Sequence, residues 1–370
     1  MINAIILFGG KSVEHDISVI TYTQVISAID LKKYNVRSVY LDQDNNFYLL
    51  KNDYLKIKCL NDLLKVNNLK RCCFKRKYHK NKYQGYCNNF LVDIVINCVH
   101  GKGLEDGTIS SYFDLLDIKY TNSNLSSSLI FHNKFYTKLI LNKYNIKTLS
   151  YDYISLYNWQ NKQQEELKKL KNYQSLVIKP VNLGSSIAIK SFNEGYQKED
   201  VINAIDNCFL YDDGILIEKK LAKFYEYNQA GYKIHNEFVI SKIEEVKNDS
   251  SIYDFNDKYQ NDNITKVINV KIDNKIKVLI NKTTRKIMEI FNQKGVIRVD
   301  YLYDVINNTL FVNEINVIPG ALAFYLFEAK NIYFPKLIDD LVKEALNSQF
   351  RPITLYNSTI LQSNKYNKYK

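Results

Sequence analysis

Glycine and proline are scarce in this chain: 370 residues contain only 12 Gly and 4 Pro. Lys, Asn, Ile and Tyr are abundant instead, which is typical of an AT-rich coding sequence. The formal net charge of +12 therefore does not by itself indicate a polyanionic partner. With 46% hydrophobic and 24% charged residues, the composition is that of a globular protein and excludes fibrous and disordered classes.

Long apolar runs are also missing, since no stretch approaches the roughly 20 apolar residues of a membrane span. The opening MINAIILFGG lacks a basic flank and a cleavage site, so we expect a first strand rather than a signal peptide. Six cysteines form no CxxC pair, and only five histidines are present, which disfavours structural zinc and favours free thiols. We expect a cytoplasmic protein without a membrane partner.

The most basic stretch, residues 69–86, interleaves aromatic residues with Lys and Arg. Such a pattern is compatible with a surface for single-stranded nucleic acid. A solvated β-hairpin explains it as well, because strand-forming residues flank the charges. We favour the hairpin and expect no nucleic-acid partner.

The N-terminal region predicts an open α/β sheet, in a chain long enough for two or three domains. Apolar strands are expected at 4–10 and 91–101, with a helix over 17–29 after the first. Each strand is followed by a polar loop, GGKSVEHDIS and HGKGLEDGTIS. Since ligands bind at the carboxyl ends of strands in such sheets, we expect both loops on one rim.

Two polar pairs interrupt an otherwise apolar hairpin predicted over 296–317, with its turn at Asn307 and Asn308. Arg298 and Asp300 are two residues apart on the first strand, as are Glu314 and Asn316 on the second. Side chains two apart share a face of a strand. A surface salt-bridge ladder is one interpretation. We favour a Mg²⁺ site, because oxygen ligands converge there from rigid strands.

A second hairpin is predicted where SLVIKP and IAIKSF flank the small-residue turn NLGSS at 182–186. Lys179 precedes this turn. Backbone amides and hydroxyls of such a turn can bind phosphate. Alone the turn is a weak signal, but together with the metal patch it indicates a nucleotide site.

The motifs EHDIS, HGKGLEDGT, FHNKFYTK, VIKPVNLGSS, LIEKKL, FNDKYQ, VIRVDY and VNEINVIPG occur in this order. In order and spacing, over roughly residues 3–348, they resemble the D-alanine–D-alanine ligases of the ATP-grasp superfamily. The resemblance implies a three-domain α/β (partly α+β) architecture. The expected parts are an N-terminal substrate-binding domain (1–122), a central ATP-grasp subdomain (123–215), a C-terminal ATP-grasp subdomain with the metal site (216–356) and a polar tail (357–370).

The resemblance also implies that ATP phosphorylates the carboxylate of one D-alanine, which the amine of a second then attacks. It implies a homodimer and two Mg²⁺ ions, with Mn²⁺ as a substitute. The implied residues are Glu14, Ser185, Tyr259 and Arg298 for catalysis; Glu14, His100, Arg298 and Gly320 for D-alanine; Lys134, Lys179, Ser185, Ser186, Glu218, Leu221, Glu226 and Lys258 for ATP; and Asp300, Glu314 and Asn316 for metal.

Four positions depart from the family pattern: Leu104, Ala188, Tyr225 and Ala321. Leu104 replaces a glycine and is expected to change its turn, because a bulky residue disfavours φ > 0. Ala321 stands near the expected site of the second substrate. Two alternatives to the dipeptide ligase therefore stay open: a carboxylate–amine ligase with another acceptor, and a degenerate nucleotide-binding relative.

Overall fold

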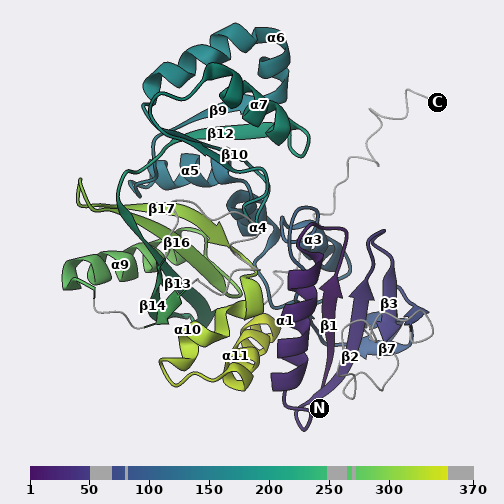
Figure 1. Cartoon of the computed structure of the whole chain (residues 1–370). Helices are drawn as coiled ribbons and strands as arrows, with labels where there is room; N and C mark the ends of the chain where they lie inside the picture. The colour runs from purple at the N-terminus through teal and green to yellow at the C-terminus, as the bar shows by residue number, and fades with distance from the viewer. Residues whose placement is uncertain (51–68, 80–81, 248–264, 269–271, 349–370) are drawn as a thin grey trace, which may run out of the picture.

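The computed structural model describes residues 1–50, 69–79, 82–247, 265–268 and 272–348. Figure 1 shows an N-terminal sheet at one side, a second sheet in the body of the molecule and a third, with its own helices, at one end. Within the described residues, no helix combines the length and apolar character needed to cross a membrane.

The N-terminal sheet has five strands in the order β4-β3-β2-β1-β8. Parallel pairing joins β1 to both β2 and β8. This confirms the predicted open sheet and the predicted helix after its first strand. The bounds are β1 Ile2–Gly9, α1 His15–Ala28, β2 Tyr34–Leu41, β3 Phe47–Leu50, β4 Leu69–Arg71, β8 Ile94–Asn97 and α3 Thr108–Leu115.

The basic stretch forms the predicted hairpin, which belongs to a small three-stranded sheet. Strands β5 (Phe74–His79) and β6 (Lys82–Cys87) pair antiparallel, and β7 (Phe90–Val92) follows. Phe74 is buried at its base, whereas Tyr78 and Tyr83 near its end are 64% and 62% exposed. The hairpin is therefore anchored at one end and solvated at the other.

A four-stranded sheet in the order β11-β10-β12-β9 forms the end of the molecule at the top of Figure 1. The predicted hairpin is confirmed as antiparallel β10 and β11, but β11 covers only 190–192 because the preceding residues form a longer loop. The bounds are α4 Leu125–His132, α5 Lys134–Lys143, β9 Tyr151–Ser155, α6 Leu156–Glu166, η3 Leu167–Asn172, β10 Leu176–Pro180, β11 Lys190–Phe192, α7 Lys198–Phe209 and β12 Gly214–Lys219.

The third large sheet has the order β15-β14-β13-β16-β17. Its last two strands are the predicted polar-faced hairpin, and the turn includes Asn307 and Asn308 as expected. The bounds are β13 Phe224–Ile234, β14 Glu237–Lys247, β15 Thr265–Ile268, α9 Asn274–Ile290, β16 Ile297–Asp304, β17 Thr309–Asn316, η4 Gly320–Ala323, α10 Phe324–Glu328 and α11 Phe334–Asn347.

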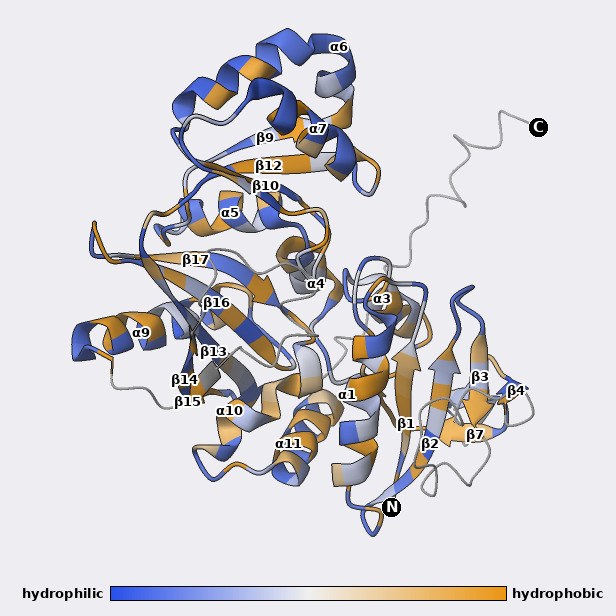
Figure 2. Ribbon diagram, viewed as in Figure 1, coloured by the Kyte–Doolittle hydropathy of each residue, from blue (hydrophilic) through white to orange (hydrophobic). Residues whose placement is uncertain are grey.

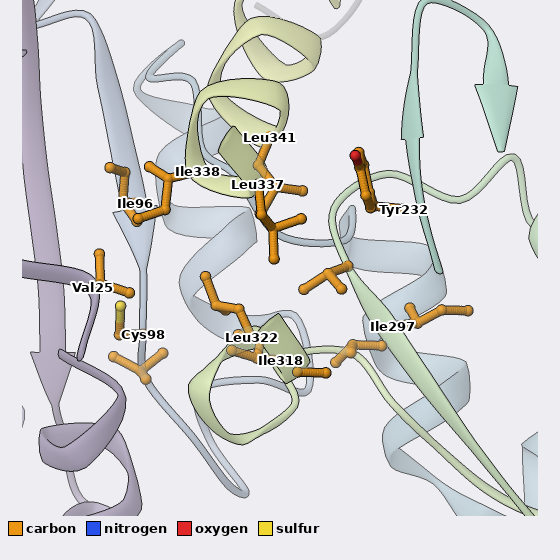
Figure 3. Close-up of a cluster of buried hydrophobic side chains, with 14 of the residues drawn as sticks. Val25, Ile96, Cys98, Tyr232, Ile297, Ile318, Leu322, Leu337, Ile338 and Leu341 are labelled. Atoms are coloured by element: carbon orange, nitrogen blue, oxygen red, sulfur yellow. The ribbon is translucent and has the colours of Figure 1, made fainter. Parts of the chain in front are cut away.

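Buried apolar side chains form two separate clusters. The larger joins the N-terminal sheet to the C-terminal sheet, and α11 lies between them. Figure 3 shows Val25 and Ile96 from the N-terminal side, Leu337 and Ile338 from α11, and Ile297 from β16 in this cluster. The smaller cluster is confined to elements between Ile154 and Ile217. Figure 2 shows that strand β1 of the larger cluster and strand β12 of the smaller cluster are largely hydrophobic.

Candidate active site

Glu14 lies where three loops meet, at the N-terminus of α1. The Ser185 hydroxyl donates a hydrogen bond to its Oε1 atom. Glycines flank the carboxylate: a Cβ on Gly184 would lie 2.8 Å from Oε1, and one on Gly101 would lie 3.1 Å from Oε2. A larger residue at Gly184 would displace the carboxylate, and one at Gly101 would clash with the Ser12 hydroxyl beside it. Burial raises the pKa of Glu14, and the nearby Glu105 carboxylate raises it further.

Glu105 lies between two histidines, in the second predicted loop. His100 Nδ1 is 3.7 Å from Glu105 Oε2, and His132 Nδ1 is 3.5 Å from Oε1. Burial alone would raise the pKa of the Glu105 carboxyl, but the two imidazoles hold it well below its usual range. The other ring nitrogen of His100 is 3.0 Å from the Thr21 hydroxyl. Glu105 is therefore an ionised carboxylate inside the protein.

Three lysines lie around Glu218: Lys134 and Lys179, which were predicted, and Lys138, which was not. The Glu218 carboxylate forms 2.8 Å ion pairs with both Lys179 and Lys138, and all three side chains are buried. Lys134 lies close by and donates to the Leu183 carbonyl at 2.5 Å. Burial lowers the pKa of Lys134, while Glu314 is the strongest of the carboxylates that oppose this shift. The central lysines therefore face the predicted metal hairpin.

The four polar residues of the β16–β17 hairpin form one patch, which confirms the predicted pairing. Arg298 lies opposite Asn316, and Asp300 lies opposite Glu314. Arg298 Nε and Nη2 donate to the two Asp300 oxygens at 2.7 and 2.8 Å. Burial would lower the pKa of Arg298, but Asp300 raises it well above its usual value. The guanidinium therefore stays charged in a fixed orientation.

A β-bulge between Asp300 and Tyr301 places an additional residue, Asn313, on β17. Lys179 Nζ donates to Asn313 Oδ1 at 3.3 Å, which links the central sheet to the hairpin. A bulge aims a side chain differently from the regular alternation. Sequence periodicity did not identify this contact because it assigns residues to faces without a register shift.

The hairpin offers a suitable donor set for Mg²⁺. Asp300, Glu314 and Asn316 supply carboxylate and amide oxygens from paired strands, and hard cations prefer such ligands. Among the described residues, no group of three His, Cys, Asp or Glu could hold a metal ion. Two carboxylates and an amide fit an ion that also binds substrate phosphates.

Other predicted residues lie at the edges of this arrangement. Leu221 is buried outside both hydrophobic clusters, and Glu226 lies on β13 opposite Leu302. Ser186 follows Ser185 in the loop before β11, and Gly320 begins η4. The remaining two predicted residues, Lys258 and Tyr259, lie outside the described residues.

Two of the four departures, Leu104 and Ala321, contact residues that follow β1. Leu104 does not take the left-handed conformation, which falls on Gly103 (φ 84°), so the expected strain at Leu104 is absent. Its buried side chain packs instead against Gly10, where an added Cβ would clash with it. Ala321 adopts φ 54°, a conformation that favours glycine, and its N–H donates to the Thr21 hydroxyl at 3.1 Å.

The other two departures are Ala188 and Tyr225. Ala188 has φ 57°, a conformation that favours glycine, so the substitution there retains strain. Tyr225 is 44% exposed on β13 and rests beside the Tyr227 ring. Nothing in its surroundings explains the loss of an arginine.

Sequence reasoning missed several polar groups of the site. Burial raises the pKa of Tyr325 to about 12 against the opposing charge of Arg298, and its hydroxyl lies 3.4 Å from Glu244. Glu105 stood inside a quoted motif without an assigned role. His132 and Lys138 lie within about one helical turn of Lys134, on α4 and α5. Their closeness in sequence to this predicted residue could have identified them.

Comparisons with known proteins agree over nearly the whole chain. The family model described as D-ala D-ala ligase N-terminus matches residues 3–123, and the one described as D-ala D-ala ligase C-terminus matches 140–343. A D-alanine--D-alanine ligase of Thermosipho africanus is 33% identical over 361 residues, 94% of each chain. One from Helicobacter pylori is 30% identical over 364 residues, 97% of this chain and 98% of that one.

Solved structures show the same fold. The crystal structure of the Helicobacter pylori D-alanine–D-alanine ligase has a TM-score of 0.73 and 26% identity, and covers 95% of this chain and 100% of that chain. The ligase from Coxiella burnetii has a TM-score of 0.76 at 23% identity, with 94% and 95% covered. Matches of this length in sequence and structure include every described part of the site, and the chain belongs to the D-alanine–D-alanine ligase family of ATP-grasp enzymes.

Proposed function

We propose that this chain uses ATP to join two D-alanines into D-alanyl-D-alanine for peptidoglycan precursors. The carboxylate of the first D-alanine attacks the γ-phosphate of ATP, which releases ADP and gives an acyl phosphate. The amine of the second D-alanine then attacks the acyl carbon, the C–O bond to phosphate breaks, and the amine loses a proton. The products are the dipeptide, ADP and inorganic phosphate.

The observation that carries this proposal is the convergence of charged residues from the three regions that contain the large sheets. Lys134 experiences the charges of Glu14 and Glu314, although these residues come from opposite ends of the sequence. Lys179 reaches Asn313 on the metal hairpin. Cations for phosphate, a carboxylate for an ammonium and oxygen donors for a metal therefore lie near one another.

The first D-alanine is assigned to the N-terminal side of this arrangement. Glu14 receives its ammonium, and the Ser185 hydrogen bond holds the Glu14 carboxylate in place. His100 lies near the substrate carboxylate, with its orientation fixed by Glu105 and Thr21. Because Glu14 is buried, an amino acid that brings its own positive charge is favoured over a neutral acid.

ATP is assigned to the space between the central and C-terminal sheets. Lys134 and Lys179 bind its phosphates together with the Ser185–Ser186 turn. Glu218 and Leu221 border adenine, and Glu226 binds ribose. Two Mg²⁺ ions, or Mn²⁺, held by Asp300, Glu314 and Asn316 would neutralise the phosphate charge.

Arg298 is assigned to the oxyanion that forms when the second amine attacks. Its bidentate contact with Asp300 fixes the guanidinium before substrate binds. Donors that are oriented in advance stabilise developing charge without further reorganisation. Gly320 and the adjoining Ala321 border the second D-alanine. The side chain at position 321 is therefore the one that would determine which acceptor is used.

Lys258 and Tyr259 are assigned to a lid that excludes water from the acyl phosphate. The proposed setting is a cytoplasmic homodimer organised as the three domains expected from the sequence, with no nucleic-acid partner.

The direct test is phosphate release from ATP by the full chain with Mg²⁺ and D-alanine, with L-alanine as the control. We expect release only with D-alanine, and a dipeptide product by mass spectrometry. Absence of D-alanine-dependent release would refute the proposal. A panel of second amines, analysed by product mass, would reveal an acceptor other than D-alanine.

A further inference from the structure

A cavity of about 110 Å³ lies apart from the residues assigned to substrate, nucleotide and metal, none of which lines it. Its walls come mainly from residues 118–122 after α3, residues 294–295 before β16, and the C-terminal half of α11. A buried water needs roughly 10–15 Å³, and pockets for drug-sized ligands measure about 300–1,000 Å³. The cavity therefore fits a molecule of several non-hydrogen atoms.

Gly295 closes one side of this cavity. Its φ is 68°, and a Cβ there would lie 2.7 Å from the Thr121 carbonyl oxygen. Glycine allows this conformation and this close approach without strain. The approach brings the neighbouring Lys294 against the N-terminal region, where its charge influences the pKa of both Lys119 and Asp114. The cavity thus lies between the two regions that the larger hydrophobic cluster joins.

Charged side chains of both signs line the cavity: Lys119, Lys294, Asp114 and Glu344, all half-buried. Burial lowers the pKa of Lys119, and the ammonium of Lys294 lowers it further. Burial raises the pKa of Asp114. The cavity therefore contains partly desolvated charges of both signs, which a ligand with complementary charges would stabilise.

Two of these charges, Lys294 and Glu344, have no partner within the described ranges. There, neither side chain forms an ion pair or a hydrogen bond. Lys119, by contrast, donates to the Ser348 carbonyl. An unpaired ammonium from the segment before β16 and an unpaired carboxylate from α11 therefore line the same cavity.

We propose that this cavity binds a small free α-amino acid, whose carboxylate pairs with Lys294 and whose ammonium pairs with Glu344. The inference goes beyond the proposed function and does not depend on it. The carboxylates of the cavity would repel an anion, and its two ammonium groups would repel a cation, whereas a zwitterion supplies one charge of each sign. Ile118 and Leu341, which Figure 3 labels on α11, add apolar wall for a small side chain.

The alternatives are that water alone fills the cavity or that the cavity binds an anion. Calorimetry on the wild-type chain separates them, with L-alanine and glycine as probes. L-Alanine is chosen because the proposed active site takes the D-enantiomer. We expect both amino acids to bind, and N-acetyl-L-alanine, L-alaninamide and acetate to bind at least about 10-fold more weakly than L-alanine. Each of these three molecules lacks one of the two charges.

Substitutions then locate the binding. Lys294→Gln and Glu344→Gln should each weaken L-alanine binding by about 10-fold or more, the size of a hydrogen bond between charged groups. Lys343→Gln, at an exposed position on α11, is the matched control and should bind L-alanine as wild type does. Glu14→Gln should also retain L-alanine binding, because Glu14 does not line the cavity. The melting temperature of each variant reports its folding.

Absence of binding by both L-alanine and glycine at about 50 mM would overturn the inference. Acetate binding as tight as that of L-alanine would also overturn it, because the cavity would then be an anion site. Loss of L-alanine binding in folded Glu14→Gln would place the ligand in the proposed active site instead. If a cavity variant does not fold, the comparison of L-alanine with the three singly charged molecules on wild type decides.

Discussion

The ion-pair cluster around Glu218 gives a prediction with a calculable size. Glu218 pairs with Lys138 and Lys179 at 2.8 Å each, and the three side chains are 3%, 1% and 6% exposed. Glu218→Gln keeps the shape but leaves two buried ammonium groups without a counter-charge. Breaking a buried ion pair by removing one partner costs about 3–5 kcal/mol. We expect a loss of that size in unfolding free energy at pH 7.

The pH dependence of this loss has a definite sign. Burial lowers the pKa of Lys138, and removal of Glu218 lowers it further. Between that pKa and the usual lysine value of about 10.4, unfolded Glu218→Gln chains bind more protons than folded ones. The stability of the variant therefore rises with pH in this window, and its deficit relative to wild type shrinks.

At acid pH the stability difference depends on another group, because only wild type carries the Glu218 carboxylate. Burial would raise the pKa of Glu218, but the lysines lower it overall. A lowered carboxylate pKa contributes stability above the unfolded value of about 4.3, and this contribution is lost as pH falls through the folded pKa. Wild type loses this contribution at acid pH. The stability deficit of Glu218→Gln is therefore largest between the folded pKa of Glu218 and the pKa of Lys138 in the variant.

The assay follows unfolding in urea through Trp159, the single tryptophan of the chain. Trp159 belongs to the smaller hydrophobic cluster and donates to Asp206 at 2.7 Å. Glu194→Gln, at an exposed position, is the matched control and should match wild type. A Glu218→Gln deficit below about 1 kcal/mol at pH 7, or one that grows toward pH 10, would refute the reasoning.

Three further changes test the site and its backbone. Glu314→Gln should lower turnover by about 10²-fold or more while leaving the melting temperature near wild type; wild-type turnover would exclude its metal role. Gly184→Ala places a Cβ 2.8 Å from Glu14 Oε1 and should raise the KM for the first D-alanine at least about 10-fold in the phosphate-release assay; an unchanged KM would contradict this. Ala188→Gly relieves the strain of φ 57° and should stabilise the chain by up to about 1 kcal/mol in thermal melts. The control Ala204→Gly lies within α7 and should destabilise the chain by about that amount. If both substitutions change stability in the same direction, backbone strain at Ala188 is not the cause.

The polar hairpin was predictable because its information is local. Side chains alternate along a strand, and the short turn brings the two strands back into register. Arg298, Asp300, Glu314 and Asn316 therefore followed from spacing alone. The bulge at Asn313 did not, since nothing in the spacing signals an additional residue. The Lys179–Asn313 contact depends on that bulge.

The other half of the site depends on contacts between distant residues. Ser185 bonds to Glu14 across 171 positions of sequence, and Glu105 brings together His100 and His132. Periodic patterns relate residues only a few positions apart, so they do not predict such contacts. Resemblance to a family supplied Glu14, Ser185 and His100, because matching motifs does not depend on the distance between them. It supplied no role for His132, whose contact with Glu105 is visible only in the folded chain.

Packing explains why these two halves act together. Helix α11 carries adjacent aspartates that bond in different directions: Asp339 accepts from Tyr34 at 2.8 Å, and Asp340 accepts from Tyr232 at 2.9 Å. Tyr34 belongs to the N-terminal sheet and Tyr232 to the C-terminal sheet, so the helix ties the two together within one hydrophobic cluster. The loops around Glu14 and the strand that carries Arg298 are thereby fixed relative to one another. Lys179, which we assign to the ATP phosphates, comes from a sheet with its own separate core. The residues proposed for D-alanine are thus positioned by one continuous core, and the proposed ATP site lies between this core and a second.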